Sequence, residues 1–118
     1  IERCPTNAII EPFVINSNLC IAYHTIENRN KAMPKHIENN LNGWIAGCDI
    51  CQDVCPWNKK VPFNKSIEAA PKKWVQNMNI DSLSWDEKKW EENLKGTTLR
   101  RIRPWMWKRN IEAMLKQK

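Results

Sequence analysis

Five cysteines constrain this chain more than any other feature of its sequence. They occupy positions 4, 20, 48, 51 and 55 of 118 residues, so all lie in the first half and three lie within eight residues. An odd number cannot be fully paired in intramolecular disulfides, and such clustering is typical of metal binding in a reducing compartment. The cysteines therefore predict a metal centre in a cytoplasmic protein.

The last three cysteines have an iron–sulfur spacing. Residues 48–56 read C-x2-C-x3-C-P. Bacterial ferredoxins carry C-x2-C-x2-C-x3-C-P, in which the last cysteine ligates the other of two [4Fe–4S] clusters. The first cysteine of that run would fall at position 45, which is Ile45. The spacing predicts a cluster whose remaining ligand comes from a distant part of the chain.

A second Cys-Pro step, Cys4-Pro5, lies at the start of the chain. By the crossed pattern of two-cluster ferredoxins, Cys4 belongs to the cluster of the later motif, and Cys55 belongs to a cluster whose other three ligands are missing here. The chain is thus expected to be a segment of a longer protein, cut inside a cluster motif. One complete [4Fe–4S] site then has four ligands: Cys4, Cys20, Cys48 and Cys51.

Zinc is the main alternative for these four cysteines, because a C-x2-C pair is also common in zinc sites. The x3-C-P ending is not a zinc-knuckle spacing, however, and zinc leaves Cys55 and the repeated Cys-Pro step unexplained. Iron–sulfur is the stronger hypothesis, and buried thiols without metal are the weakest.

Positive charge is confined to the C-terminal segment. Residues 1–93 carry 11 Lys/Arg and 12 Asp/Glu, whereas residues 94–118 carry 8 Lys/Arg against one acidic residue. The net charges of −1 and +7 account for the formal +6 of the chain. Such a segment can bind phosphates or an acidic partner, and a solvated helix face is an equally good interpretation.

The pattern of residues predicts a mostly α fold. Strand alternation is absent, glycine is scarce, and no apolar run is long enough to span a membrane. We expect a ferredoxin-like [4Fe–4S] module over residues 1–65, truncated at its N-terminus, and a helical C-terminal extension over residues 66–118. Residues 44–65 are expected to be mostly loop.

Helix start and stop signals divide the chain further. The first expected helix is capped by Asn16 or Ser17 and reaches Ile26, and the second is opened by Pro34 and ended by Gly43. A third begins at Ser66, and a fourth is capped by Ser82 or Ser84 and stopped by Gly96. The last opens at Thr97 or Thr98 and breaks or restarts at Pro104.

Four stretches together resemble a known family, the epoxyqueuosine reductases. Residues 4–12, CPTNAIIEP, are similar to the family's CPTGAI-x-EP, and residues 20–27, CIAYHTIE, to its CISYLTIE helix. Residues 47–58, GCDICQDVCPWN, resemble GCDDCQxVCPWN, and residues 95–101 with 108–110 resemble GSALRR…LKRN. The resemblance covers nearly the whole chain. Asn7 and Ile50 depart from it, standing where the family has Gly and Asp.

The resemblance implies a redox role. Cys4, Cys20, Cys48 and Cys51 match the ligands of the family's second [4Fe–4S] cluster, and Cys55 matches the fourth ligand of its first. In the family, two clusters pass electrons from an external donor to cobalamin, which reduces epoxyqueuosine to queuosine in tRNA. The cobalamin domain and the catalytic acid lie upstream, so no catalytic residue is expected here and the isolated chain is expected to be inactive.

The resemblance also implies that the enzyme binds tRNA through its anticodon arm. We expect a monomer that does not associate with a membrane. The candidate contacts are basic residues: Arg29, Lys31, Arg100, Arg101 and Arg103. Two rivals remain, a ferredoxin-type electron carrier or redox subunit, and a cobalamin enzyme like the reductive dehalogenases. The +7 segment favours the tRNA enzyme, because neither rival needs a site for a polyanion.

Overall fold

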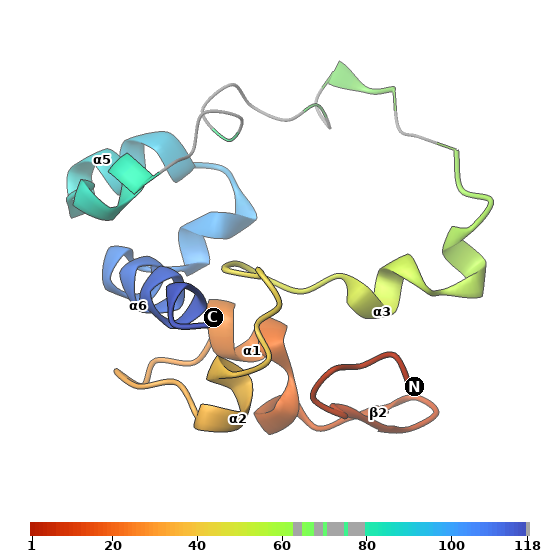
Figure 1. The fold of residues 1–118 in the computed structure, drawn as a ribbon. Helices are drawn as coiled ribbons and strands as arrows, with labels where there is room; N and C mark the ends of the chain where they lie inside the picture. The colour runs from red at the N-terminus through yellow and green to blue at the C-terminus, as the bar shows by residue number, and fades with distance from the viewer. Residues whose placement is uncertain (63–64, 68–69, 71–74, 76–79, 118) are drawn as a thin grey trace.

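A computed structural model describes residues 1–62, 65–67, 70, 75 and 80–117 (Figure 1). Short α-helices and 3-10 helices (labelled η) follow a small N-terminal hairpin. The elements in chain order are β1 (Ile9–Glu11), β2 (Val14–Ile15), η1 (Ser17–Leu19), α1 (Ile21–Ile26), α2 (Lys35–Glu38), α3 (Ile50–Asp53), η2 (Pro56–Asn58), η4 (Ile80–Ser84), α5 (Glu87–Leu94), η5 (Thr98–Arg101) and α6 (Pro104–Leu115).

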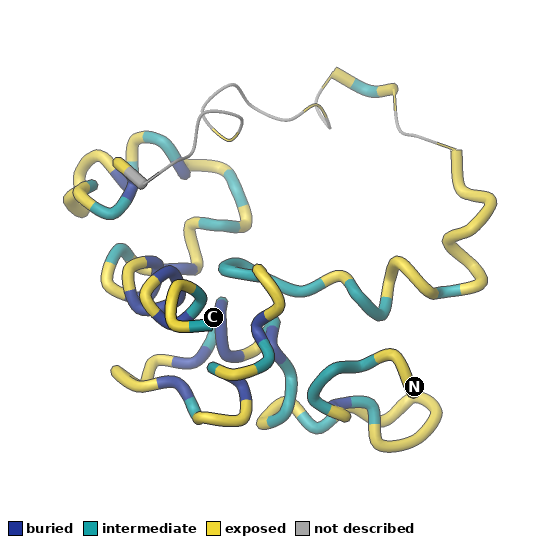
Figure 2. The backbone as a smooth tube through the Cα atoms, in the orientation of Figure 1, coloured by how far each residue is buried: buried dark blue, intermediate teal, exposed yellow. Residues whose placement is uncertain are grey.

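Helix α6 is the centre of the hydrophobic core. In Figure 1 it lies between α5 and the α1–α2 region, and the buried stretches of Figure 2 gather along it. One face packs with α5 and η5 in a first cluster: Trp90, Leu94, Ile102, Met106, Trp107 and Ile111. The other face contributes to a second cluster around α1 and α2: Ile21, Met33, Ile37, Leu41 and Ala113. The two clusters join the C-terminal segment to the N-terminal one.

The cluster-bearing segment also packs on this core. Ile45 and Ala46 lie against the first hydrophobic cluster, and Cys48 lies against the second. The position where a ferredoxin would carry a cysteine is therefore a packing position in this fold. An apolar side chain at residue 45 anchors the loop that leads to Cys48.

The expected first helix is interrupted at Cys20. The side chain of Asn16 accepts a hydrogen bond from the Asn18 N–H, as expected of a cap, but it opens only the three-residue η1. Cys20 is extended (φ −86°, ψ 122°) and becomes the N-cap of α1. The break turns one expected helix into two short ones and leaves Cys20 at a junction.

The other expected helices are present with different ends. Pro34 is the N-cap of α2, which ends at Glu38 and not at Gly43. Asp86, and neither serine, caps α5, because its Oδ1 accepts the Lys89 N–H at 2.8 Å. The expected helix from Ser66 falls largely outside the described residues. Pro104 begins α6, as the restart signal predicted.

The N-terminal hairpin is an element that the weak strand signals of the sequence did not indicate. Strands β1 and β2 pair antiparallel, with Ile9 opposite Ile15. The strands are only three and two residues long, too short to produce a visible alternation in the sequence. Phe13 in the connecting turn has a left-handed φ of 69°. Helices still form most of the regular structure, so the mostly α class stands.

A buried polar pair on α6 holds the end of α1. Arg109, 9% exposed, donates from Nη2 to the His24 carbonyl at 2.7 Å and from Nη1 to the Asn28 and Asn30 carbonyls at 2.9 and 2.6 Å. A helix C-terminus presents unpaired carbonyls and a partial negative charge, which suits a buried cation. Burial, and then the charge of Arg29, lower the pKa of Arg109, yet a guanidinium stays protonated at neutral pH.

The C-terminal helix is thus packed on the cysteine-bearing module through apolar and polar contacts alike. Asn110, fully buried beside Arg109, donates to the carbonyls of Thr25 and Ile45 at 2.8 and 2.9 Å. The division at residue 65 stays a prediction, but α6 contacts α1 directly.

We expect Arg109→Lys to destabilise the fold by about 2 kcal/mol, because one ammonium cannot reproduce the fork of charge-assisted hydrogen bonds to three carbonyls. Urea unfolding of the chain measures this loss. The reciprocal change at its neighbour, Lys108→Arg, is the control, since Lys108 is exposed. Equal midpoints for the two variants would contradict a structural role for Arg109.

Candidate iron–sulfur site

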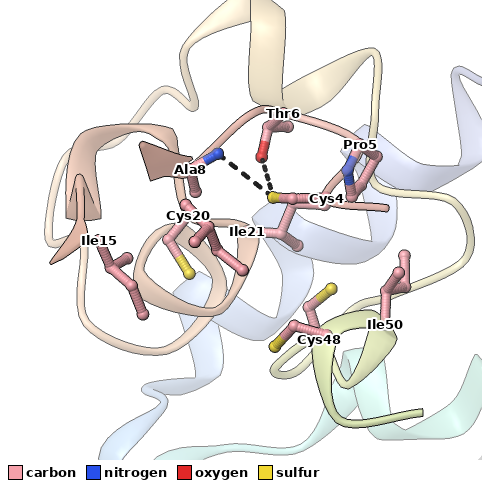
Figure 3. Close-up of a pocket in the computed structure, with 11 residues that line it drawn as sticks. Cys4, Pro5, Thr6, Ala8, Ile15, Cys20, Ile21, Cys48 and Ile50 are labelled. Carbon is pink, nitrogen blue, oxygen red and sulfur yellow. Dashed lines mark hydrogen bonds between the residues drawn. The ribbon is translucent and has the colours of Figure 1, made fainter. Parts of the chain in front are cut away.

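Four cysteines from separate segments line one pocket. Cys4 lies in the loop before β1, Cys20 at the start of α1, Cys48 just before α3, and Cys51 within α3. Figure 3 shows the labelled cysteines around a common space. The structure therefore brings together the four residues that spacing assigned to one cluster, across 47 positions of sequence from Cys4 to Cys51.

The remaining wall of the pocket is mostly apolar. Around the four cysteines it is lined by Pro5, Thr6, Ala8, Ile9, Ile15, Ile21 and Ile50. Ala8 and Ile21 are 2% exposed, and all four cysteines are half-buried. Such walls limit the access of water, which is one means by which a protein tunes the potential of an iron–sulfur cluster.

Two left-handed residues shape the approach to the cysteines. Gly47, immediately before Cys48, has φ +80°, a conformation that strains any residue with a Cβ. Asn7, three residues after Cys4, has φ 53°. Asn is among the non-glycine residues that best tolerate this region, which explains how Asn7 stands where the resembling family has Gly.

Hydrogen bonds favour the thiolate of Cys4. The Ala8 N–H donates to Cys4 Sγ at 3.2 Å, and the Thr6 hydroxyl lies 3.7 Å away. Burial opposes ionisation, but the bonds from the Thr6, Ala8 and Ile9 backbone and from the Thr6 side chain together bring the pKa of Cys4 below its ordinary value. Backbone N–H groups directed at sulfur are a recurring feature of iron–sulfur sites.

Cys48 shows the opposite effect. Burial is the largest cause that raises its pKa, and the charges of Cys51, Cys20 and Cys4 raise it further. Four thiolates in one pocket repel each other, so the site favours a cationic group that neutralises them. Metal binding would release protons from the thiols that remain protonated.

The arrangement fits a multi-atom group better than a single ion. The cavity volume is about 50 Å³, whereas a cavity that holds one water needs roughly 10–15 Å³. A tetrahedral zinc ion needs sulfurs at about 2.3 Å from one centre. Within the described residues, no three His, Cys, Asp or Glu side chains are arranged to hold one metal ion. A [4Fe–4S] cluster, which four cysteine thiolates hold, matches this donor set.

Cys55 lies at an adjoining pocket. It lines this second space together with Ile1, Arg3, Val54 and Pro56. Cys4 and Cys51 line both pockets, so the two spaces are neighbours. The structure thus separates Cys55 from the group of four.

Three of the five candidate nucleic-acid contacts are engaged within the chain. Arg100 pairs with Glu91 at 2.7 Å, and Arg101 pairs with Glu27 at 2.7 Å. Arg29 donates to the Arg101 carbonyl at 3.0 Å. All three side chains are exposed, so these are surface interactions of small stability that a phosphate can displace.

The other two candidates are free. Lys31 and Arg103 are exposed, and in the described part of the chain neither side chain has a hydrogen-bond or ion-pair partner. Much of the +7 of residues 94–118 is therefore engaged internally, with Arg109 buried and Lys116 3.7 Å from Glu38.

Sequence reasoning missed three buried residues that bond to the backbone near the cysteines: Thr25, Arg109 and Asn110. The available signal was the KRN stretch at residues 108–110, which served only to show a resemblance. Nothing local in α6 indicates that Arg109 and Asn110 reach carbonyls about 80 residues earlier.

Of the helices within the described residues, none has the length and apolar composition that a membrane span requires.

Comparison with known proteins agrees with the cysteine pattern. The family described as "4Fe-4S double cluster binding domain" matches residues 1–58. An epoxyqueuosine reductase of Prochlorococcus marinus (strain NATL2A) is 53% identical over 99% of this chain and 38% of its own length. Those of Synechococcus sp. (strain CC9605) and Aliivibrio fischeri (strain ATCC 700601 / ES114) are 49% and 39% identical over 96% and 98% of this chain, and 36% and 31% of their own lengths.

The chain thus spans between 31% and 38% of the length of these three relatives. No solved structure gave a significant match. The identity extends along nearly the whole chain, through both the cysteine segment and the C-terminal helices. On these grounds the chain matches a segment of the epoxyqueuosine reductases along nearly its whole length.

Proposed function

We propose that this chain is the iron–sulfur electron-transfer portion of an epoxyqueuosine reductase. The observation that carries the proposal is the pocket in which Cys4, Cys20, Cys48 and Cys51 meet. These four residues would hold one complete [4Fe–4S] cluster. When bound, the cluster supplies one-electron chemistry; the chain positions its ligands, shields it with apolar side chains and provides N–H groups to sulfur.

Cys55 would ligate a second, adjoining cluster. Its pocket shares the walls at Cys4 and Cys51 with the first, so two clusters bound there would be neighbours. Ile1 and Arg3 line the same space, which places the first residues of the chain beside Cys55. Ligands preceding Ile1 in a longer protein could therefore reach this pocket. Neighbouring clusters suit stepwise passage of electrons.

In the whole enzyme, electrons from an external donor would pass through these clusters to cobalamin, for reduction of epoxyqueuosine to queuosine in tRNA. The relatives' printed name supports this reaction, and cobalamin and the catalytic acid would belong to the part of the protein outside this chain. The cysteine chemistry favours the cytoplasm, and we expect a monomer.

Contact with tRNA would use the exposed basic residues. Among these candidates Lys31 and Arg103 are the most available, since neither has a side-chain partner in the described part of the chain, while Arg29, Arg100 and Arg101 would exchange internal partners for phosphate. A ferredoxin-type carrier without an RNA substrate is the alternative, and the free cations favour the RNA enzyme over it.

Anaerobic reconstitution with iron and sulfide should load about one [4Fe–4S] cluster per chain, or about four irons, because one set of four ligands is complete. Cys51→Ala should abolish loading, whereas the matched variant Cys55→Ala should keep it. Iron analysis and the visible spectrum measure both. Iron near eight per chain, or a requirement for Cys55 with Cys4 dispensable, would overturn the ligand assignment.

Replacing Lys31 and Arg103 with Gln in the whole enzyme should weaken tRNA binding and flatten its salt dependence. Each lost phosphate contact removes roughly 0.7–0.9 from the log–log salt slope. The control is a Lys60→Gln, Lys88→Gln double variant, which removes the same charge from other exposed positions. If both proteins keep the slope of the unmodified enzyme, these residues do not contact tRNA.

A further inference from the structure

We propose that Thr25 and Asn110 are positioning residues for the iron–sulfur cluster. Together they would set the separation between the segment that carries Cys20 and the segment that carries Cys48. The inference rests on the proposed cluster function and concerns residues that lie outside the pocket lining.

Thr25 links the two segments directly. Its hydroxyl donates to the Ile21 carbonyl at 2.9 Å, one residue after Cys20. The same oxygen accepts the Gly47 N–H at 3.0 Å, one residue before Cys48. Thr25 is fully buried, so water does not compete for either bond.

Asn110 joins the same two segments from the C-terminal helix. Its Nδ2 donates to the Thr25 carbonyl at 2.8 Å and to the Ile45 carbonyl at 2.9 Å. Its Oδ1 accepts Arg109 Nη2 and Nε at 2.9 and 3.1 Å. These partners determine the amide orientation, because a flip would put its NH₂ against the guanidinium and its oxygen against two carbonyls.

Few other polar links hold these segments together. Across the described residues, no backbone–backbone hydrogen bond joins residues 20–28 to residues 44–51. The Thr25–Gly47 bond is the direct one, and Asn110 bridges the two from outside. The Ile26 side chain adds an apolar contact, since its Cδ1 would lie 3.7 Å from a Cβ at Gly47.

The consequence concerns the cluster ligands. Cys20 and Cys48 are each one residue from a group bonded to Thr25, so a shift of one segment against the other changes the spacing of two thiolates. Removing groups that orient metal ligands from outside the coordination sphere typically costs 10–100-fold in metal affinity. A general loss of stability would not single out the cluster.

Three variants of the full chain test the proposal. Thr25→Val removes the hydroxyl but keeps the shape of the side chain. Thr25→Ser keeps the hydroxyl and loses only the methyl group. Asn110→Asp keeps the acceptor for Arg109 but places an oxygen against the Thr25 and Ile45 carbonyls. The matched control is Thr97→Val, because the Thr97 hydroxyl donates to the Leu94 carbonyl at 2.8 Å beyond the end of α5, far from any cysteine in sequence.

After anaerobic reconstitution, iron transfer to a chelator and the electron paramagnetic resonance spectrum of the reduced cluster are measured beside urea unfolding. We expect Thr25→Val and Asn110→Asp to release iron about 10–100-fold faster with altered spectra. Thr25→Ser and Thr97→Val should release it at the unmodified rate. If Thr25→Val and Asn110→Asp release iron at the rate of Thr97→Val and give the same spectrum, the proposal is overturned.

Amide hydrogen exchange of the metal-free chain gives a readout independent of the cluster. The Gly47 N–H should exchange at least about tenfold faster in Thr25→Val than in Thr25→Ser, because its acceptor is gone. Unchanged exchange would overturn the link between Thr25 and Gly47. A different result is that the unmodified chain takes up no cluster while exchange of the Gly47 N–H does respond to Thr25→Val. In that case the proposed function fails, the hydrogen bond between Thr25 and Gly47 is real, and its role in positioning cluster ligands is overturned.

Discussion

The burial of Arg109 and Asn110 against the carbonyls of α1 is the interaction on which this structure most depends. The helices are short, and the hairpin contributes only five strand residues, so little regular backbone bonding joins the parts. One guanidinium and one amide instead satisfy carbonyls from His24 to Ile45. Removing either would leave buried carbonyls unsatisfied, which costs more than the bond itself contributes.

This constraint explains why the C-terminal helix and the cysteine segment act as one unit. The proposed cluster site draws ligands from four places in the chain, and none of the local elements is long enough to hold its cysteine alone. Helix α6 provides the common support through two hydrophobic clusters and a buried polar pair. A bound cluster would add its own links between the same segments, so folding and cluster binding should be coupled.

Charge has two roles in the C-terminal segment. Arg109 is structural, and Arg100 and Arg101 pair with acidic side chains on α5 and after α1. Of the candidate contacts, Lys31 and Arg103 have no side-chain partner among the described residues, and they come from different halves of the sequence. A basic stretch in a sequence therefore overstates the charge that a partner meets, because the fold engages part of it internally.

Local spacing determined the chemistry of this protein, since C-x2-C-x3-C-P with a repeated Cys-Pro step indicates iron–sulfur binding without knowledge of the fold. It also indicated the existence of most helices, because caps, prolines and glycines act on neighbouring residues. The end of each helix, the split at Cys20 and the hairpin depended on packing. Only the tertiary structure decided that Thr25, Arg109 and Asn110 bond to the backbone near the cysteines, because their partners lie up to 85 residues away and polar side chains carry no periodic signal of such contacts.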